Sequence, residues 1–189
     1  MSIVFMDTET TSLLAVEAAD ITNQPYIVEI ACVKSNIHFD PPEVYTQLIK
    51  PPIRIPDEVI KIHHITNQDV ASMKPFAGYY KKLADFFLGV THLVGHNLQF
   101  DKRVLENELK RINKLTNFPW PPINICTVEE IFKLRGHRMN LGNLHEELLG
   151  YRFEEAHRAE ADTLALMRVF EAMVSKGMIP WQEKMTTIS

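Results

Sequence analysis

The sequence is poor in cysteine, in long apolar runs and in excess positive charge. Its two cysteines, Cys32 and Cys126, cannot make a disulfide framework, and both lie in apolar runs, which indicates buried free thiols in a reducing compartment. No run approaches the length of a membrane-spanning helix. The chain also reaches Asp7 too soon to hold the apolar region of a signal peptide. We therefore expect a cytoplasmic protein with no membrane partner.

The formal net charge of −4 argues against a broad basic surface that grips nucleic acid non-specifically. It does not exclude a nuclease, because bound divalent metals would neutralise part of an acidic cluster and attract phosphate. At 189 residues, with 46% hydrophobic and 23% charged residues, the chain is of ordinary globular type and long enough for one sizeable core. We predict a single domain over residues 1–177 and a short tail over residues 178–189.

Apolar runs rich in β-branched residues predict five strands. They cover residues 3–5, 26–33, 44–49, 92–96 and 123–128. The first three are joined by short connections, which favours an antiparallel meander. Glu29 lies inside the second run and needs a partner if it is buried; a structural bond is favoured over catalysis.

Apolar residues at helical spacing predict helices over residues 76–90, 99–113 and 159–174. Shorter helical pieces are expected within 56–73, up to Leu134 and over 141–149, and the Ala-rich centre of 12–24 predicts a short helical excursion. The basic side chains of the 99–113 helix form a solvated face in the favoured interpretation and contact phosphate in the other; they are Lys102, Arg103, Lys110 and Arg111. Strands followed by alternating helices and strands predict an α/β fold with a mixed five-stranded sheet, the meander plus parallel strands, flanked by helices.

The first candidate site is the pair Asp7 and Glu9, directly after the first strand. At positions i and i+2 of an extended chain, both side chains lie on one face. Two adjacent carboxylates repel each other, and a hard cation such as Mg²⁺ or Mn²⁺ relieves that repulsion. An isolated Asp-x-Glu is more often an exposed strand end with two solvated acids, so acids from elsewhere in the chain have to support the metal hypothesis.

Further acids stand at positions that this architecture can bring to the same place. Asp101 lies in the first turn of the predicted 99–113 helix, where the helix dipole alone would favour an acid. Asp162 lies early in the last predicted helix and is preceded by His157. A histidine before a helix is, taken alone, an inert surface residue.

Three motifs occur in order: Asp-x-Glu-Thr-Thr at 7–11, His-Asn-x-x-Phe-Asp at 96–101 and His-x-x-x-x-Asp at 157–162. Together they resemble the DEDD exonuclease superfamily over roughly residues 1–175. The histidine identifies the DnaQ-like (DEDDh) branch, which includes proofreading subunits of bacterial replicative DNA polymerases. The resemblance implies a ribonuclease-H-like fold and 3′→5′ removal of nucleoside monophosphates from a nucleic-acid end.

Carried over to this sequence, the resemblance implies that Asp7, Glu9, Asp101 and Asp162 hold two divalent cations, Mg²⁺ or Mn²⁺, at the scissile phosphate. It implies that His157 takes the proton of the attacking water. Imidazole suits this task because its ordinary pKa of about 6.5 leaves it neutral and basic near pH 7–8. A metal-ligand role for His157 is the alternative, disfavoured because the acids already suit hard cations.

The resemblance also implies a set of substrate-binding residues: Thr8, Thr10, Thr11, Ile65, Thr66, His96, Asn97 and Phe100. Thr10 and Thr11 would offer hydroxyl or backbone donors to the terminal nucleotide. Ile65, with Thr66 beside it, would wedge an apolar side chain against the terminal base.

His96, Asn97 and Phe100 would position sugar and phosphate, or else cap and pack the corner between strand and helix. The chain departs from the family pattern at two places near these expected substrate-binding residues. His64 and Ser12 stand where glycine is usual, and each adds a Cβ atom that changes the expected shape of the pocket.

The predicted substrate is the 3′ end of single-stranded DNA, favoured over RNA by the resemblance to proofreading enzymes, and a DNA polymerase is a further expected partner. An RNA-trimming 3′→5′ exoribonuclease of the same branch is the nearest alternative, because discrimination between the sugars depends on contacts to the 2′-OH. A catalytically silent binding module on the same fold is less favoured, since this chain keeps all the acids and the histidine. A metal-binding structural domain leaves His157 unexplained.

Overall fold

The computed structural model describes residues 2–16, 20–36, 38, 40–153 and 158–179. Five strands form one mixed sheet in the order β3-β2-β1-β4-β5. The strands are β1 (Ser2–Thr10), β2 (Ile27–Asn36), β3 (Glu43–Leu48), β4 (His92–Gly95) and β5 (Ile123–Cys126). The pairs β1/β2 and β2/β3 are antiparallel, whereas β1/β4 and β4/β5 are parallel. The sheet is therefore the predicted meander extended by parallel strands.

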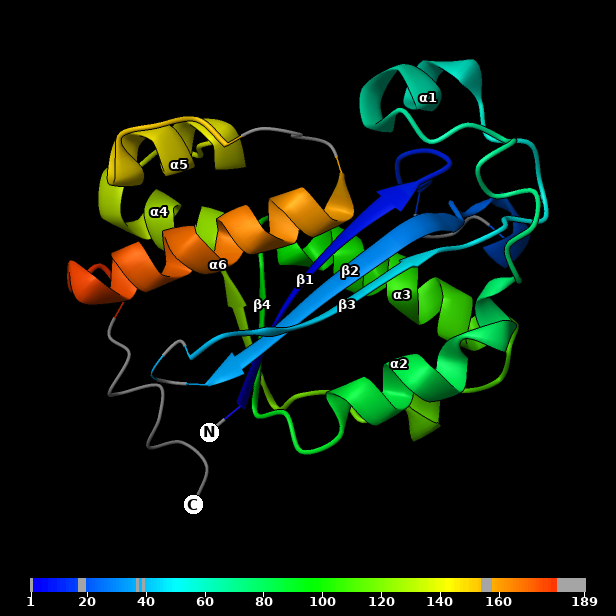
Figure 1. Ribbon diagram of the computed structural model, residues 1–189, viewed down its shortest axis with the longest axis horizontal. Helices are drawn as coiled ribbons and strands as arrows, with labels where there is room; N and C mark the ends of the chain where they lie inside the picture. The colour runs from blue at the N-terminus through cyan, green and yellow to red at the C-terminus, as the bar shows by residue number, and fades with distance from the viewer. Residues whose placement is uncertain (1, 17–19, 37, 39, 154–157, 180–189) are drawn as a thin grey trace.

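Helices cover both faces of this sheet (Figure 1). They are α1 (Asp57–His63), α2 (Tyr80–Phe87), α3 (Leu98–Arg111), α4 (Thr127–Arg135), α5 (Leu141–Leu149) and α6 (Ala159–Ser175). Helices α2 and α3 pack on one face, and α5 and α6 on the other. None of the helices in the described ranges combines the length and apolarity needed to cross a bilayer.

The central strand β1 is buried on both faces, which explains its continuous apolar start. Val4 and Met6 point to the α2/α3 side, where they join the first core cluster. Ile3 and Phe5 point to the α5/α6 side and join the second, in which the rings of Phe5 and Phe170 meet edge to face at 5.5 Å. Because side chains alternate along a strand, this register fixes where every later residue of β1 points.

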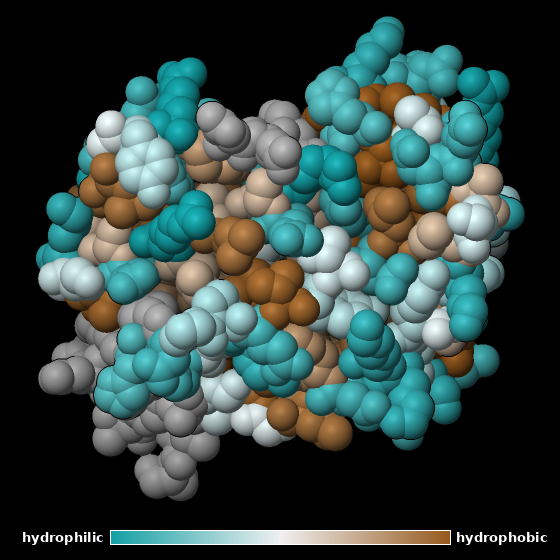
Figure 2. Space-filling model, in the orientation of Figure 1, coloured by the Kyte–Doolittle hydropathy of each residue, from teal (hydrophilic) through white to brown (hydrophobic). Residues whose placement is uncertain are grey.

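A third, smaller cluster holds the segment that contains α1 against the end of β2. It consists of Val28, Ile55, Ile65 and Val70, with Leu48 among the partly buried side chains around it. On the face shown in Figure 2, hydrophobic side chains form separate patches between hydrophilic ones. The four buried residues of this cluster are used for internal packing, whereas Ile53 and Ile62 nearby in the sequence are 49% and 51% exposed.

The elements differ from the sequence-based expectations mainly at their ends. β1 runs on to Thr10 instead of stopping at Phe5, because β2 pairs with it along its whole length. The expected helix over 76–90 is a 3₁₀ turn (Phe76–Gly78) followed by α2. Val128, expected in a strand, belongs to α4. Ala15 is not helical, and residues 17–19 lie outside the described part.

The ordered core also extends slightly beyond the predicted domain boundary. Met178 and Ile179, assigned to the tail by the sequence, pack against the second core cluster. The backbone N–H of Met178 donates to the carbonyl of Met173. The remainder of the predicted tail, residues 180–189, lies outside the described part of the chain.

Candidate active site

The end of β1 projects beyond its parallel neighbour. β4 pairs with β1 only from Ile3 to Phe5, whereas β2 continues to pair with β1 up to Thr10. Residues from Asp7 onwards therefore have a strand on one side only. By alternation Asp7 and Glu9 share the face of Phe5, toward α6, and Thr8 points to the face of α3.

Asp101, in the first turn of α3, fills the place that β4 leaves beside Thr8. Its Oδ1 accepts two hydrogen bonds from Thr8, one from the backbone N–H at 3.0 Å and one from the hydroxyl at 2.7 Å. Asp101 is 4% exposed. The carboxylate thus satisfies a strand N–H that has no neighbouring strand, and this contact holds α3 to the end of β1.

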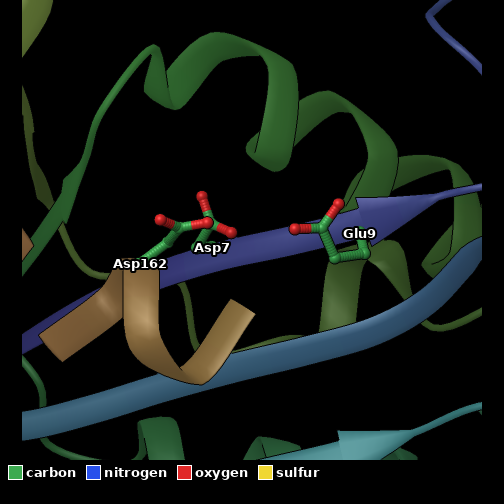
Figure 3. A group of neighbouring side chains, drawn as sticks. All are labelled: Asp7, Glu9 and Asp162. Carbon is green, nitrogen blue, oxygen red and sulfur yellow. The ribbon is translucent and has the colours of Figure 1, made fainter. Parts of the chain in front are cut away.

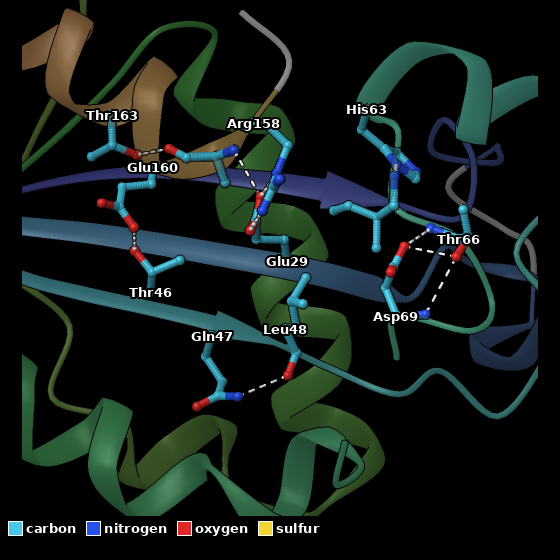
Figure 4. A network of polar contacts seen from close by, with 12 residues as sticks. Glu29, Thr46, Gln47, Leu48, His63, Thr66, Asp69, Arg158, Glu160 and Thr163 are labelled. Atoms are coloured by element: carbon cyan, nitrogen blue, oxygen red, sulfur yellow. Dashed lines mark hydrogen bonds and ion pairs between the residues drawn. The ribbon is translucent and has the colours of Figure 1, made fainter. Parts of the chain in front are cut away.

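Asp162 comes from the first turn of α6, whose start is anchored to β2. The carboxylate of Glu29, 1% exposed, accepts a hydrogen bond from the backbone N–H of Ala159 at 3.0 Å. It also pairs with Nη2 of Arg158 at 2.8 Å (Figure 4). Arg158 offers the helix no side-chain cap, so Glu29 does this from another element. The partner expected for Glu29 is therefore structural.

Three of the predicted acids meet at one point between β1 and α6. One carboxylate oxygen each from Asp7, Glu9 and Asp162 lies within 4.8 Å of the others. Figure 3 shows Asp7 and Glu9 rising from the same strand toward Asp162 on the helix. Asp101 is not part of this threefold group, but its charge acts on Asp7 more strongly than that of any other acid.

The electrostatics of this group are unfavourable without a cation. Burial, then the charges of Asp101 and Asp162, raise the pKa of Asp7 well above its ordinary value. Burial and the charge of Asp162 raise the pKa of Glu9 to about 8. Burial raises the pKa of Asp101 to about 7, although the hydrogen bonds from Thr8 act in the opposite direction.

This donor set fits a hard divalent cation. It offers only carboxylate oxygens, which Mg²⁺ and Mn²⁺ prefer, and the charges that raise the pKa of Asp7 are those of neighbouring acids. A cation among these oxygens would remove the repulsion that raises their pKa values.

Comparison with protein families gives the arrangement its context. The family model described as Exonuclease (RNase_T) matches residues 4–170. This chain belongs to the exonuclease family. The matched range contains β1, α3 and the start of α6, the elements that carry the four acids.

Related sequences agree with this membership. The exonuclease is 32% identical over 173 residues to the DNA polymerase III subunit epsilon of Treponema pallidum, a match that covers 89% of this chain and 74% of that protein. It is 27% identical over 195 residues to a DNA polymerase III subunit epsilon-like protein of Rhodobacter capsulatus, a match that covers 100% of this chain. It spans 26% of that second, much longer relative.

Among solved structures, the nuclease domain of 3′hExo, a DEDDh family member bound to rAMP, superimposes with a TM-score of 0.73. The match has 20% sequence identity and covers 94% of this chain and 93% of that one. The predicted exonuclease family and its ribonuclease-H-like fold are therefore confirmed.

The remaining predicted site residues that the structure describes either make structural contacts or line a cavity. His157, the predicted base, lies outside the described residues. The hydroxyl of Thr10 donates to the carbonyl of Ser12 at 2.8 Å. Thr11 exchanges hydrogen bonds with Tyr26, its backbone N–H donating at 3.0 Å and its hydroxyl oxygen accepting at 3.0 Å. Both threonines fix the turn that leaves β1.

Ile65 and Thr66, expected beside the terminal base, have internal partners. Ile65 is 2% exposed and packs with Val28 in the third core cluster, so in this structure it is a core residue rather than an exposed wedge. The backbone N–H and hydroxyl of Thr66 both donate to Oδ2 of Asp69 at 2.7 Å (Figure 4). His64 follows α1 in the left-handed conformation, with φ of 60°, which is where glycine is usual.

The ring of His96 connects the corner between β4 and α3 to two segments that lie further along the chain. Its Nδ1 lies 2.9 Å from the hydroxyl of Thr127 and its Nε2 lies 3.0 Å from the carbonyl oxygen of Met139. Burial lowers its pKa to about 4, so the ring is neutral near pH 7. Of the two interpretations of His96, these contacts support packing of the corner. Asn97 and Phe100 instead line a cavity along α3.

Two relationships at the site go beyond the sequence-based interpretation. Thr8, expected to contact substrate, is the partner of Asp101. Arg158, for which the sequence predicts no role, pairs with Glu29 across 129 positions of the sequence. The available signal was the acid inside an apolar strand, which demanded a partner without identifying it.

Proposed function

We propose that this exonuclease removes nucleoside 5′-monophosphates from the 3′ end of single-stranded DNA. The observation that supports this most directly is the meeting of Asp7, Glu9 and Asp162 within 4.8 Å, with Asp101 beside them. The group lies at the projecting end of β1, beyond the residues that pair with β4, and its three acids are half-buried rather than enclosed. Divalent cations would balance its negative charge and would also attract the negatively charged phosphodiester.

In this proposal Asp7, Glu9, Asp101 and Asp162 hold two divalent cations, Mg²⁺ or Mn²⁺. When bound, the cations supply charge neutralisation at the scissile phosphate and at the leaving 3′-oxygen, and acidify the attacking water. The chain's own part is to fix the carboxylates on rigid elements. Thr8 orients Asp101, and Glu29 fixes the first turn of α6, from which Asp162 projects.

We assign the removal of the water proton to His157. The support is its motif, which places it directly before Arg158 and five residues before Asp162. Arg158 and Ala159 are both bound by Glu29, so the chain that follows His157 is fixed relative to the acids. Loss of His157 should therefore lower kcat far more than it changes substrate binding.

Two features of relatives bear on the substrate. The 32% identical relative carries the name of a DNA polymerase subunit, which favours DNA and a polymerase as partner. The structural neighbour contains rAMP, which supports the second candidate, an exoribonuclease that trims RNA. We favour DNA because the sequence likeness is the closer relationship. A cytoplasmic location is supported by the two free cysteines.

Matched DNA and RNA oligonucleotides, each labelled at the 5′ or the 3′ end, test this function with Mg²⁺ or Mn²⁺ present. We expect stepwise shortening of 5′-labelled DNA, release of a labelled mononucleotide from the 3′ end, and slower action on RNA. Asp7→Asn should lose at least about a thousandfold in rate, and the exposed acid variant Glu58→Gln should retain wild-type activity. Full activity of Asp7→Asn would refute the metal assignment, and preference for RNA would select the second candidate.

A polymerase partner is tested separately by gel filtration of the exonuclease mixed with the catalytic subunit of a bacterial replicative polymerase. Co-elution is the expected result. Separate elution at micromolar concentration would leave an exonuclease that acts alone.

A further inference from the structure

Positive charge is concentrated on one side of the molecule. The segment 74–114, which contains α2, β4 and α3, holds eight basic and four acidic residues, a formal charge of +4, whereas the whole chain carries −4. Helices α2 and α3 lie next to each other on one face of the sheet (Figure 1). The net charge of the chain therefore does not describe this side of the molecule.

The acids of this segment already have partners. Three of them form ion pairs on their own helix: Asp85 with Lys81 at 2.6 Å, Glu106 with Arg103 at 3.6 Å and Glu108 with Arg111 at 3.1 Å. The fourth, Asp101, accepts the hydrogen bonds of Thr8. In the part of the chain that the structure describes, no carboxylate lies within ion-pair distance of Lys102, Lys110 or Lys114. The charges of these three lysines are therefore available to an anionic ligand.

Aromatic rings hold two of these ammonium groups in place. The Nζ of Lys102 lies 5.4 Å from the ring centroid of Trp120, and the Nζ of Lys114 lies 5.8 Å from that of Tyr80. Trp120 is itself fixed by an edge-to-face contact with Phe118 at 4.7 Å. A cation is attracted to the face of an aromatic ring, so these side chains lose less freedom when they bind an anion than unsupported lysines would.

The lysines lie at increasing distances from the acid site. Lys102 directly follows Asp101, and Lys110 lies nine positions after Asp101, which corresponds to about 13 Å along the helix axis. The backbone N–H of Lys114 donates to the carbonyl of Leu109 at 2.8 Å, so Lys114 stays in the turn that closes α3. Successive phosphates of a stacked strand advance about 3.4 Å, so Lys110 lies about four nucleotides from the acid site.

This arrangement fits a regular polyanion whose end lies at the acid site. A nucleic-acid strand carries one phosphate per nucleotide, and lysine side chains that contact phosphates fix the position of the strand without reading its sequence. In the proposed function the 3′ end is held at the acids, so the phosphates that follow have to pass along a neighbouring element. An acidic protein segment would also be attracted to the lysines, but nothing requires its charges to begin at the acid site.

We propose that Lys102, Lys110 and Lys114 form a phosphate-binding ridge on α3, and that Lys110 and Lys114 hold the substrate strand about four nucleotides from its 3′ end. The inference rests on the proposed function and specifies its substrate class as strands long enough to reach this ridge. Of the two interpretations of the basic side chains of α3, it selects phosphate contact for Lys102 and Lys110. Oligonucleotides that end before Lys110 should bind more weakly.

Competition binding in EDTA tests the ridge without catalysis. Unlabelled DNA strands of three and twelve nucleotides compete with a fluorescent twelve-nucleotide strand at several salt concentrations. We expect Lys110→Gln/Lys114→Gln to bind the long strand about tenfold more weakly than wild type does at low salt, and to bind the short strand, which cannot reach either lysine, as wild type does. The slope of log affinity against log salt for the long strand should fall by about 1.4, because two phosphate contacts are lost.

Two matched variants separate the position of the charges from their number. Arg168→Gln/Lys176→Gln removes two exposed cations along and just after α6, and it should keep the wild-type salt slope and affinity. Lys110→Arg/Lys114→Arg keeps the charge and should bind the long strand as wild type does. Thermal melting confirms that each variant is folded.

An unchanged affinity and salt slope for the long strand in Lys110→Gln/Lys114→Gln would overturn the ridge, as would an equal loss in Arg168→Gln/Lys176→Gln. Displacement of the long strand by polyglutamate of equal charge, as tightly as by DNA, would also overturn it and assign these lysines to an acidic protein partner. Because cleavage is assayed separately, an active enzyme that lacks the length effect refutes this inference alone, and an inactive one refutes the proposed function.

Discussion

Glu29 of β2 accepts a hydrogen bond from the backbone N–H of Ala159, the first residue of α6, at 3.0 Å. The two residues are 130 positions apart in the sequence. Glu29 also faces Glu9 across the β1/β2 ladder. One buried carboxylate therefore links the helix that carries a third acid to β2, the strand paired with the one that carries the first two.

Glu29→Ala should weaken this link. We expect a loss of about 1–3 kcal/mol in the free energy of unfolding, because a helix cap and a partner of a charged pair disappear together. The cost stays moderate because the side chain of Arg158 is 45% exposed and can be solvated. Catalytic activity should fall mainly in kcat, since α6 positions Asp162. Urea denaturation and steady-state kinetics measure the two effects.

The conservative variant Glu29→Gln serves as a control, because its amide oxygen can still accept from Ala159. It should regain part of both losses. Glu43→Gln, which removes an exposed partner of Lys34, should change neither. A Glu29→Ala enzyme with normal kcat would show that α6 holds its place by packing alone.

The acid cluster predicts how stability depends on pH. The folded-state pKa values of Glu9 and Asp101 are about 8 and about 7, against ordinary values of 4.5 and 3.8. Between the ordinary and the folded-state values these two acids bind more protons in the folded protein than in the unfolded chain. Their contribution to stability is therefore fully present below about pH 4 and is lost as pH rises through 7 and 8. Metal-free protein should lose at least about 1 kcal/mol, or about 2–4 °C in melting temperature, from about pH 5 to about pH 8.

Saturating Mg²⁺ or Mn²⁺ should reverse this trend, because bound cations stabilise the deprotonated carboxylates. Melting curves recorded with EDTA and with metal across the pH range provide the measurement. Asp162→Asn should flatten the metal-free profile and abolish the metal effect. A metal-free protein whose stability rises across this range would contradict the assigned pKa shifts.

Thr8→Val isolates the bond that orients Asp101. Valine has nearly the same shape and keeps the backbone donor, but it removes the hydroxyl bond of 2.7 Å. We expect activity to fall about tenfold at limiting Mg²⁺ and to recover in part at high Mg²⁺, because Asp101 is left less well oriented. Thr46→Val, which also loses one hydroxyl bond to an acid, Glu160, should retain normal metal dependence.

His64→Gly should stabilise the protein. His64 has a φ of 60° at the end of α1, a conformation that costs a non-glycine residue free energy and costs glycine almost none. We expect a gain of about 0.5–1 kcal/mol in chemical denaturation, with His64→Asn between the two. A loss of stability would mean that the exposed imidazole makes a contact worth more than the strain.

The sequence specified the placement of the acids because alternation along β1 and the first turns of α3 and α6 are local rules. Asp7 and Glu9 share a face, as predicted. The contacts of Glu29 and Thr8 could not be derived in this way, since each joins residues about a hundred positions apart. For Ile65 the motif predicts contact with a base, whereas the structure buries its side chain against Val28. That burial depends on how the loop after β3 folds back, which the motif does not specify.

Two of the four acids, Asp7 and Glu9, lie on the central strand of the sheet. This strand has neighbours on both sides for its first half, and α3 and α6 lie against its end. Amide protons there should exchange with solvent only through global unfolding, whereas the edge strands β3 and β5 can fray without disturbing the centre. Nuclease activity and the folded structure of the sheet should therefore be lost at the same temperature.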